Sequence, residues 1–465
     1  MTIGVISIIV SLILLMYLAY RGFSVIVVAP ILSLCAVAVA ALALGQSPEV
    51  MAHYTELFML NAGNYVRNFF PIFLLGAVFG KLLEASGSAD SISEYVTSKL
   101  GSKNAILAVV LSCAILTYGG VSLFVVSFAI YPIGAKLFRE AGINKRLLPG
   151  AIALGAFTFT MTALPGSPQI QNAIPMKYLG TDAYAAPILG LVASAIMFGG
   201  GMLWLISRAK FFSKKYPGYG EWKEDLIQFD EEHLKNMPSV IVAALPILVC
   251  LITNYVLSKH VFPNQNLEYL EKYKTTAKAV IGNWSLILAL LLAIVVTIIL
   301  NYKRMKDIVG TVNSGVSGSF LAIFNTASET GYGNIIASMA AFTVIASAIT
   351  SISSNTLVTA GISTSVLAGF TGSASGGLSI ALNTMGDQLL QSAAAAGIRP
   401  EVLHRVASVA CGGMDTLPHN GAVITLLAIT QMKHRDSYLD IGMNTVIIPL
   451  IALVVIIFLG SMGIA

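Results

Sequence analysis

Long stretches without a single Asp, Glu, Lys or Arg recur from one end of the chain to the other. They cover residues 2–20, 22–48, 68–80, 104–135, 147–176, 183–207, 236–258, 279–302, 308–328, 330–386, 406–414, 416–432 and 441–465. A helix of roughly 20 mostly apolar residues is long enough to cross a bilayer. We therefore predict an all-α polytopic membrane protein with about ten full spans plus two re-entrant hairpins.

The composition excludes several soluble classes of protein. Of the 465 residues, only 11% are charged and 56% are hydrophobic, whereas a soluble domain carries about 25% charged residues. The net charge of +5 does not indicate nucleic-acid binding, because the basic residues form short clusters between apolar runs. A water-soluble enzyme, a disordered chain and a nucleic-acid binder are excluded. The predicted location is a cell inner (plasma) membrane, with the lipid bilayer as a partner.

Four clusters of basic residues predict which loops face the cytoplasm. The clusters are Lys136, Arg139, Lys145 and Arg146; Arg208, Lys210, Lys214 and Lys215; Lys303, Arg304 and Lys306; and Lys433 and Arg435. Two cytoplasmic loops must be separated by an even number of crossings. Two spans indeed lie between Arg146 and Arg208, and two more lie between Lys235 and Lys303. Counting outwards from these loops places both termini outside.

The run 104–135 is too long for one ordinary span, and both of its flanks carry lysines that look cytoplasmic. It is interrupted by Thr117-Tyr118-Gly119-Gly120-Val121-Ser122. We interpret it as a re-entrant helical hairpin with its tip inside the bilayer. The alternative is one long kinked helix.

The chain contains an internal repeat. Gly119-Gly120-Val121-Ser122 recurs as Gly376-Gly377-Leu378-Ser379, and Ala141-Gly142-Ile143 recurs as Ala396-Gly397-Ile398. Ala163-Leu164-Pro165-Gly166-Ser167 is answered by Thr416-Leu417-Pro418-His419-Asn420-Gly421. Three matches in the same order, at an offset of about 255 residues, indicate two copies of one unit.

The two copies are predicted to have opposite topologies. The first inverted repeat is 1–207, with a hairpin at about 104–136 and a broken helix at about 147–176; 208–235 is a cytoplasmic linker. The second is 236–465, with a hairpin at about 356–395 and a broken helix at about 404–432. In this second copy the span 308–328 leads to an amphipathic outer segment at about 333–350. Inverted repeats of this kind are typical of transporters.

The four interruptions are the predicted substrate site, because irregular backbone is tolerated in a bilayer only where it is buried or lines a cavity. No Lys or Arg is expected in the middle of a span, so half-helix N-termini would supply the positive field for an anion. The candidate substrate-binding residues are Tyr118, Gly119, Gly120, Ser122, Pro165, Gly166, Ser167, Gln169, Ser375, Gly376, Gly377, Ser379, Thr416 and Asn420. The alternative is that the small residues only let helices pack closely.

Two ionisable residues, Asp415 and His419, flank Leu417-Pro418 in the second broken helix. A titratable group at this depth is costly and is by default a functional hypothesis, so we assign both to ion or proton coupling. The alternative is that Asp415 caps the half-helix and His419 donates one hydrogen bond. Glu329 and Glu84 are expected at helix ends, in interfacial or scaffold roles.

The hairpin, the stretch 162–172 containing Leu164-Pro165-Gly166-Ser167, and the stretch 413–421 containing Asp415-Thr416-Leu417-Pro418-His419 resemble the gluconate permease family of the ion-transporter superfamily. Within that family they look closer to permeases for D-3-hydroxybutyrate. The resemblance covers nearly the whole chain. It implies a symporter for small hydroxy acids, with a proton as the favoured cation, and a homodimer with a scaffold and an elevator-like moving domain.

Other functions remain open at this point. No GxxxxGK[ST] signature and no metal-ligand cluster is present, so transport would be secondary, with no cofactor and no metal. The protein could instead carry gluconate or another small organic acid, use Na⁺ in place of H⁺, or be an uncoupled facilitator. An intramembrane enzyme, with Asp415 and His419 as acid and base, is the least favoured class.

Overall fold

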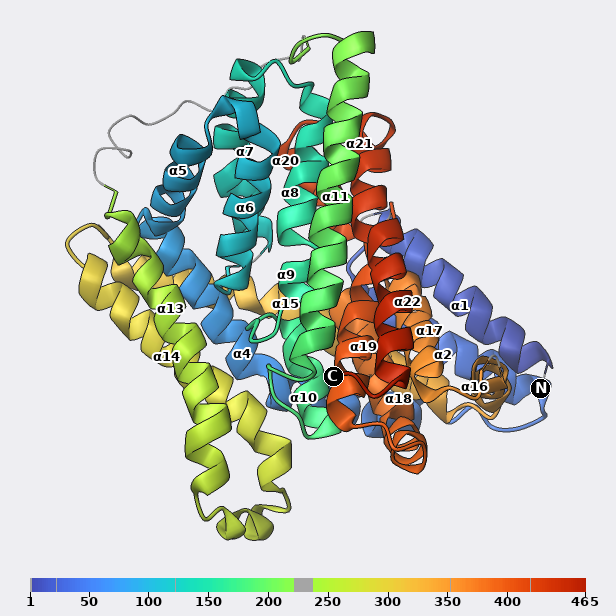
Figure 1. The fold of residues 1–465 in the computed structure, drawn as a ribbon. Coiled ribbons are helices and arrows are strands. Elements are labelled where there is room, and N and C mark those ends of the chain that lie inside the picture. The colour runs from blue at the N-terminus through green and yellow to red at the C-terminus, as the bar shows by residue number, and fades with distance from the viewer. Residues whose placement is uncertain (1, 22, 122, 221–236, 352, 419) are drawn as a thin grey trace.

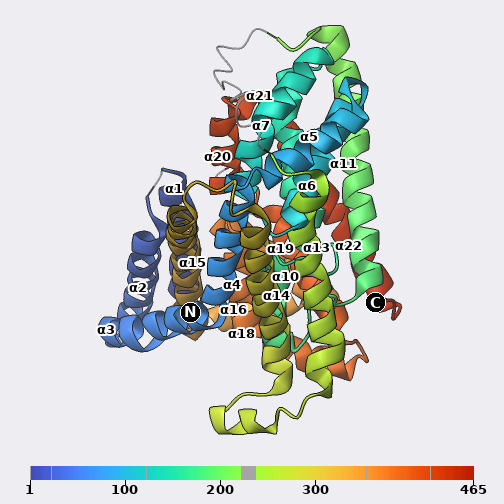
Figure 2. The same cartoon turned by 90° about the vertical axis from the view of Figure 1, so that its left-hand side faces the viewer.

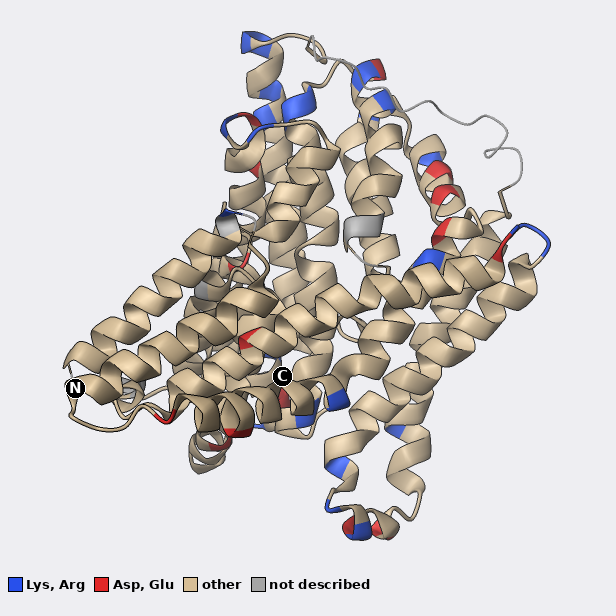
Figure 3. Ribbon diagram, turned by 180° about the vertical axis from the view of Figure 1, so that it is seen from behind, with Lys and Arg blue, Asp and Glu red and all other residues tan. Residues whose placement is uncertain are grey.

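The computed structural model describes residues 2–21, 23–121, 123–220, 237–351, 353–418 and 420–465. Throughout these ranges the regular structure is helical (Figure 1). Only a helix satisfies every backbone N–H and C=O within one apolar segment, which is why such runs become helices in lipid. Lys and Arg lie mainly at the ends of the molecule and in its loops, and the helices between them are almost free of charge (Figure 3).

Each half of the chain begins with three long helices and ends with one. In the first half they are α1 (Thr2–Tyr20), α2 (Val25–Ala43), α4 (Leu60–Ala85) and α11 (Pro187–Lys215). In the second half they are α13 (Val240–Val256), α14 (Ala277–Asn301), α15 (Ile308–Ser338) and α22 (Ile448–Ser461). Short segments extend three of them: α3 (Val50–Ala52) and η1 (His53–Met59) before α4, η4 (Leu257–Val261) and η5 (Phe262–Asn264) after α13, and α21 (His434–Gly442) and η7 (Met443–Ile447) before α22.

Shorter helices lie between the long ones. The first half has α5 (Ser88–Leu100), α6 (Ala105–Tyr118), α7 (Leu123–Glu140), α8 (Leu148–Ala156), α9 (Phe159–Thr162) and α10 (Ile170–Leu179). The second half has α16 (Phe342–Ser351), α17 (Thr356–Thr371), α18 (Ala374–Ala395), α19 (Pro400–Met414) and α20 (Gly421–Ile429). The short connections η2 (Ser102–Asn104), η3 (Lys145–Leu147) and η6 (Glu268–Tyr273) are 3₁₀ turns. Both halves thus contain a short helix, a pair of helices joined by a tight turn, and an interrupted helix, in the same order.

Contacts between the two halves come in matching pairs. The long helices α4 and α15 pack on each other, α2 packs on α15 and α14 packs on α4. Among the shorter helices, α10 packs on α18 and α20 packs on α7. The α6–α7 pair lies in the upper part of Figure 1 and the α17–α18 pair in the lower part. The lower ends of α13 and α14 and the loop between them project below the rest of the molecule (Figure 2).

Seven helices of the described chain are long and apolar enough to cross a membrane, or eight if the bent pair α5 and η2–α6 is one span. This is fewer than the ten expected. The interrupted helices are too short to qualify, and α15 is rich in Gly, Ser and Asn. The number of crossings therefore stays a prediction.

The structure corrects the predicted end of the span 308–328. The helix α15 continues through Glu329 and ends at Ser338, and the following helix is α16, where the segment 333–350 was expected. The charge at Glu329 does not mark the end of the helix, because this carboxylate is buried against neighbouring helices, with 4% of the residue exposed.

Candidate functional site

The first helix interruption, residues 163–169 between α9 and α10, holds the tip of the α6–α7 pair. Tyr118 Oη donates to the carbonyl of Pro165 at 2.7 Å. Gln169 Nε2 donates to the carbonyl of Thr117 at 2.7 Å and to that of Val121 at 3.3 Å. The three predicted residues Tyr118, Pro165 and Gln169 are therefore brought together.

Two glycines let the backbone turn and approach closely here. Gly120 has a φ of 95°, and a Cβ atom on it would lie 3.2 Å from Pro168 Cγ. Gly166 has a φ of 83°, and its Cβ position is 2.5 Å from the ring of Tyr184. Both are left-handed conformations that favour glycine. Gly119 lies beside them, against Ile247 of α13.

The second interruption, residues 415–420 between α19 and α20, holds the tip of the α17–α18 pair in a similar way. Asn420 Nδ2 donates to the carbonyl of Gly372 at 2.7 Å, while its Oδ1 accepts from the backbone N–H of Val423 at 2.9 Å. The Asp415 carboxylate lies close to the backbone N–H of Ala374, at the start of α18. In each half, an amide side chain of the interrupted helix thus binds a carbonyl at the tip of the neighbouring pair.

The tip of this second pair is not where the repeat GGVS/GGLS places it. The chain turns at Gly372 and Ser373, and Gly376, Gly377 and Ser379 lie in the first turns of α18. Gly372 is left-handed with a φ of 64°, and Ser373 caps α18 by accepting from the N–H of Gly376 at 3.1 Å. These two residues make the turn, so the matching glycines are free for helix packing.

Several of the predicted site hydroxyls are engaged inside the protein. Ser167 Oγ donates to the carbonyl of Thr160 at 2.6 Å, and Ser379 Oγ donates to that of Ser375 at 2.7 Å. Thr416 Oγ1 donates to Thr445 Oγ1 at 2.7 Å. Ser375 Oγ lies 3.3 Å from Thr326 Oγ1 of α15. These hydroxyl groups therefore have partners within the protein.

Asp415 is buried, with 6% of the residue exposed, and its Oδ1 has no hydrogen-bond partner. An unpartnered carboxylate oxygen at this depth is unusual in a folded protein. The other predicted coupling residue, His419, and the predicted substrate-binding residue Ser122 lie outside the described residues.

Arg405 contradicts the expectation that no Lys or Arg lies in the middle of a span. It is in the interior of α19 and fully buried. Its guanidinium donates to the carbonyls of Thr162, Ala183 and Ala185 and to Asn172 Oδ1, at 2.8–3.5 Å. Sequence reasoning missed it because it bounds a charge-free run, as residues at helix ends also do. The burial of Arg405 is visible only in the structure.

The surroundings of Arg405 extend into a polar network between the two halves. His404 lies with Nδ1 2.7 Å from Thr181 Oγ1 and Nε2 3.2 Å from Asn172 Oδ1. Asn172 Nδ2 donates to the carbonyls of Ser167 and Ala183, each at 2.9 Å. One arginine of the second half therefore brings a positive charge close to the first interruption.

The two interrupted helices also touch directly. Ser408 Oγ of α19 donates to the carbonyl of Gln171 in α10 at 3.1 Å. A Cβ atom on Gly412 would lie 2.8 Å from Thr162 Cγ2, at the end of α9. The two interruptions consequently lie in one region of the molecule, each beside the tip of its own helix pair.

The two glutamates expected at helix ends differ in the structure. Glu84 lies near the end of α4 with its side chain 44% exposed, and pairs with Lys81 at 2.8 Å. Glu329 lies inside α15, buried against the start of α18. The prediction is confirmed for the position of Glu84 and is wrong for that of Glu329.

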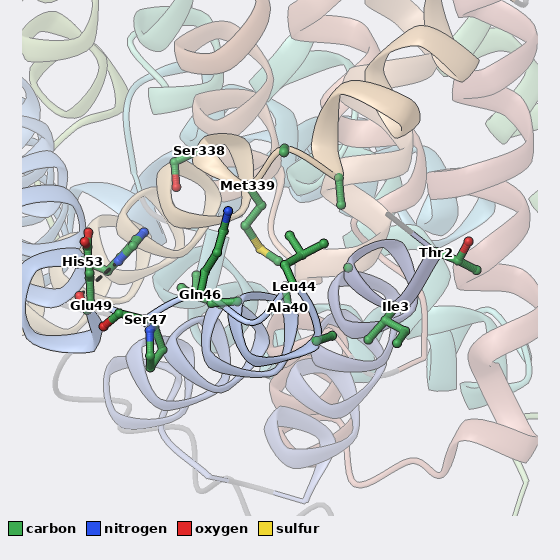
Figure 4. A pocket seen from close by; sticks show the side chains of 17 residues that line it. Thr2, Ile3, Ala40, Leu44, Gln46, Ser47, Glu49, His53, Ser338 and Met339 are labelled. Carbon is green, nitrogen blue, oxygen red and sulfur yellow. Dashed lines mark hydrogen bonds between the residues drawn. The ribbon is translucent and has the colours of Figure 1, made fainter.

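A cavity of about 800 Å³ lies away from this region, where the start of α1, the loop after α2 and the end of α15 meet (Figure 4). Gln46, His53 and Met339 are among its lining residues. None of the residues around it belongs to an interruption or a hairpin tip. The hydrogen-bonded helix interruptions, which carry the buried ionisable groups, are therefore the better candidate site.

Comparison with known proteins places the chain among transporters. The family model described as "GntP family permease" matches residues 1–462. An uncharacterized transporter of Bacillus subtilis, YxjC, is 44% identical over 456 residues, covering 95% of this chain and 96% of its own. An uncharacterized transporter of Haemophilus influenzae is 26% identical over 182 residues, which cover 39% of this chain and 40% of the relative. The names indicate transporters and not enzymes.

Solved structures of transporters share the fold. The crystal structure of the Alcanivorax borkumensis YdaH transporter superposes with a TM-score of 0.56 at 14% identity, covering 94% of this chain and 97% of the other. The Neisseria gonorrhoeae protein MtrF, described within a class of antimetabolite efflux pumps, gives a TM-score of 0.51, also at 14% identity, covering 87% and 83% of the two chains. At such low identity the likeness concerns the fold alone.

Proposed function

The chain belongs to the GntP family of permeases, and from this premise we propose that it is a secondary active symporter for a small hydroxy-monocarboxylate of the 3-hydroxybutyrate type. The observation that carries the proposal is the pair of helix interruptions, each hydrogen-bonded to the tip of a helix hairpin. In transporters, discontinuous helices at the interface between repeats bind the substrate and the coupling ion.

The electrostatics of the region favour an anionic substrate. Half-helix N-termini at α10, α18 and α20 each present a positive dipole end. Arg405 adds a positive charge, because the acceptors of its guanidinium hydrogen bonds are neutral carbonyl and amide oxygens. A buried charge acts strongly in a low dielectric. We propose that this field stabilises the substrate carboxylate, while the amides and hydroxyls at the interruptions bind its hydroxyl group.

The matching contacts of the two halves support an inverted repeat, 1–207 and 236–465, joined by the linker 208–235. The pairs α10–α18 and α20–α7, and α2–α15 and α14–α4, are what a pseudo-twofold axis would produce. The helix α22 runs down beside α11, which runs up, in Figure 1. We propose that the hairpins and interrupted helices move as one transport domain. The scaffold comprises 2–48 and 236–302, with α4 and α15, and joins two copies as a homodimer.

We propose that the coupling cation is a proton and that Asp415 carries it, with His419 as a second candidate. The unpartnered Oδ1 of Asp415 supports this role, because a buried carboxylate is most stable when it is neutralised. The proposed location is the inner membrane.

Uptake into proteoliposomes tests the function. Labelled D-3-hydroxybutyrate is offered under an inward proton gradient or an inward Na⁺ gradient, with gluconate and lactate as competitors. We expect accumulation with the proton gradient, its loss in Asp415→Asn with exchange retained, and no change in Asp387→Asn, because Asp387 is exposed. Accumulation driven only by the Na⁺ gradient would identify Na⁺ as the coupling ion in place of the proton. Uptake that does not depend on either gradient would indicate a facilitator. If no short hydroxy acid is exchanged, the proposal is contradicted.

A further inference from the structure

We propose that Glu329, together with the hydroxyl groups around it, binds one monovalent cation, a proton or Na⁺, in addition to any proton carried by Asp415. Its role in coupling rests on the proposed transport function, but the binding itself does not. The site lies where α15, α4 and the start of α18 meet.

The Glu329 carboxylate lies against the first turn of α18. Its Oε2 occupies the space in which a Cβ atom of Gly376 would lie, and it lies beside the hydroxyl of Ser373. Ser373 Oγ is 3.4 Å from Ser375 Oγ, which is itself 3.3 Å from Thr326 Oγ1. Glu329 is thus surrounded by hydroxyl oxygens of the second hairpin and of its own helix.

Tyr65 of α4 completes the cluster. Its residue is 2% exposed, and its hydroxyl lies near Ser379, Thr326 and Glu329. Both Tyr65 Oη and Glu329 Oε2 are buried without a hydrogen-bond partner. Two unpartnered oxygen atoms in one buried polar cluster indicate a missing ligand, since buried polar groups are normally paired.

A positively charged ligand would neutralise this cluster. No ion pair links Glu329 to a Lys, Arg or His in the part of the chain that the structure describes. A buried carboxylate without a counter-charge is costly. One carboxylate and several hydroxyls are hard oxygen ligands with a single negative charge, which suits one monovalent cation. Among the described residues there is no group of three His, Cys, Asp or Glu that could hold a metal ion.

Other ionisable groups on the helices packed against α15 do not neutralise Glu329. Tyr65 is the one that faces it from α4. The remaining ones on α4, η1 and α18 are not buried: Arg67, Lys81, Glu84, His53, Tyr54, Glu56 and Asp387. The buried Asp415 carboxylate, close to the backbone N–H of Ala374, is acidic and also supplies no positive charge. Helices α2 and α16 carry no acidic or basic side chain.

In the first half of the chain, an apolar side chain packs against the hairpin glycine, so packing alone does not require a carboxylate beside such a glycine. There, the hairpin-tip glycine Gly120 has its Cβ position 3.6 Å from the ring of Phe79 in α4, and Phe79 is fully buried. In the second half, Glu329 of α15 lies against Gly376 of the second hairpin. A phenylalanine fills the space in one half and a carboxylate fills it in the other, so only the second hairpin carries this charge.

The location gives the cation a mechanical consequence. The helix α15 packs on α4 and α2 and also on α18, so Glu329 lies between the proposed scaffold and the moving hairpin. With the cation bound, the neutral cluster can hold the hairpin against α15. Without the cation, the uncompensated charge of Glu329 would favour hydration of the cluster and separation of the hairpin from α15.

A binding measurement tests the site without any transport. Purified full-length protein in detergent is heated at constant ionic strength with Na⁺ replaced by K⁺ or choline, and in a separate series across pH 5–9. We expect the unfolding midpoint of the wild type to rise with Na⁺ or to change with pH, and Glu329→Gln to lose most of that response. Glu84→Gln is the matched control, since it removes an exposed carboxylate, and it should keep the wild-type response.

Tyr65→Phe keeps the ring and removes only the unpartnered hydroxyl, so it should weaken the same response even if Glu329→Gln folds poorly. A response to Na⁺ identifies sodium, and a response to pH alone identifies a proton. Equal responses of the wild type, Glu329→Gln and Tyr65→Phe, or no response in the wild type, would overturn the site. In proteoliposomes, exchange retained and accumulation lost in Glu329→Gln would support its coupling role, whereas absent exchange in the wild type would contradict only the proposed function.

Discussion

Arg405 links the two halves of the chain through a single side chain. It extends from α19 in the second half to backbone carbonyls of the first half, including that of Thr162 at the end of α9. A carbonyl at the end of a helix has no partner within the helix, and the guanidinium supplies one while adding charge beside the first interruption. The same residue therefore holds backbone beside the interruption and places a positive charge there.

Replacing Arg405 by Gln should lower the free energy of unfolding by about 3 kcal/mol, because buried carbonyls lose their donors and each unpaired group costs roughly 1–3 kcal/mol. The midpoint of thermal unfolding in detergent measures this loss. Arg399→Gln is the control, since Arg399 is exposed at the start of the same helix. Equal, small losses in both variants would show that the Arg405 hydrogen bonds contribute little.

The side chain of Asn420 has two roles: it caps α20 through Val423 and links the second interruption to the carbonyl of Gly372 in the hairpin. A substitution can remove the second role and keep the first. Aspartate at this position keeps an acceptor for the N–H of Val423 but has no donor for the carbonyl of Gly372. We expect Asn420→Asp to lose about 1–2 kcal/mol of stability and to slow substrate exchange. Asn355→Asp is the control, because Asn355 also caps a helix and its other partner is the hydroxyl of Ser461, which can itself donate. Exchange at the wild-type rate in Asn420→Asp would show that the link is dispensable.

At the scale of helices, close backbone approach holds the second hairpin together. Gly377 in α18 lies so near the backbone of Ala368 in α17 that a Cβ atom would overlap it. Helix association in membranes depends on small residues at such contacts. The glycine pair that the repeat pattern singled out therefore has a packing role at Gly377 and makes room for the Glu329 carboxylate at Gly376.

Gly377→Ala should separate α17 from α18 and cost about 1–3 kcal/mol by overpacking. Gly386→Ala in the same helix is the matched control, because the nearest atom to its Cβ position is 4.0 Å away, in Leu382. That substitution should be neutral or stabilise the helix by up to about 1 kcal/mol. Unfolding midpoints compare the two, and equal midpoints would contradict the packing role.

For the whole molecule, the order of elements and their paired contacts describe two similar halves that interlock at their centre. Every residue of α8 is buried, as are most of those in α19, whereas α1, α2, α13 and α14 expose large apolar side chains. The centre of the molecule is therefore buried and its periphery is apolar, as expected for helices that face lipid.

The predicted topology places the loop between α13 and α14 outside and the end of α11 in the cytoplasm. Single cysteines at Asn266 and Ser213, introduced after Cys35→Ser removes the exposed thiol, should react with a membrane-impermeant maleimide differently. We expect Asn266→Cys to react in intact cells and Ser213→Cys only after lysis. The other native cysteines are buried, and the Cys35→Ser background alone gives the baseline. Labelling of both sites in intact cells would contradict the orientation.

The sequence by itself determined the class of the protein and the regions where helices are interrupted. Charge-free runs must become helices in lipid, and Gly and Pro at 119–120, 165–166 and 418 mark places where a regular helix is difficult to continue. The seven or eight candidate spans fall within these runs or extend them.

Only the tertiary structure decided which charged residues are inside. Arg405 and Glu329 each lie at the end of a charge-free run. A charge at such a boundary looks the same in sequence whether the helix ends there or continues. Burial depends on partners distant in the chain, the carbonyls of 162–185 for Arg405 and the start of α18 for Glu329. The turn at Gly372 and Ser373 was likewise set by a serine cap and a left-handed glycine, not by the repeated pair Gly376-Gly377.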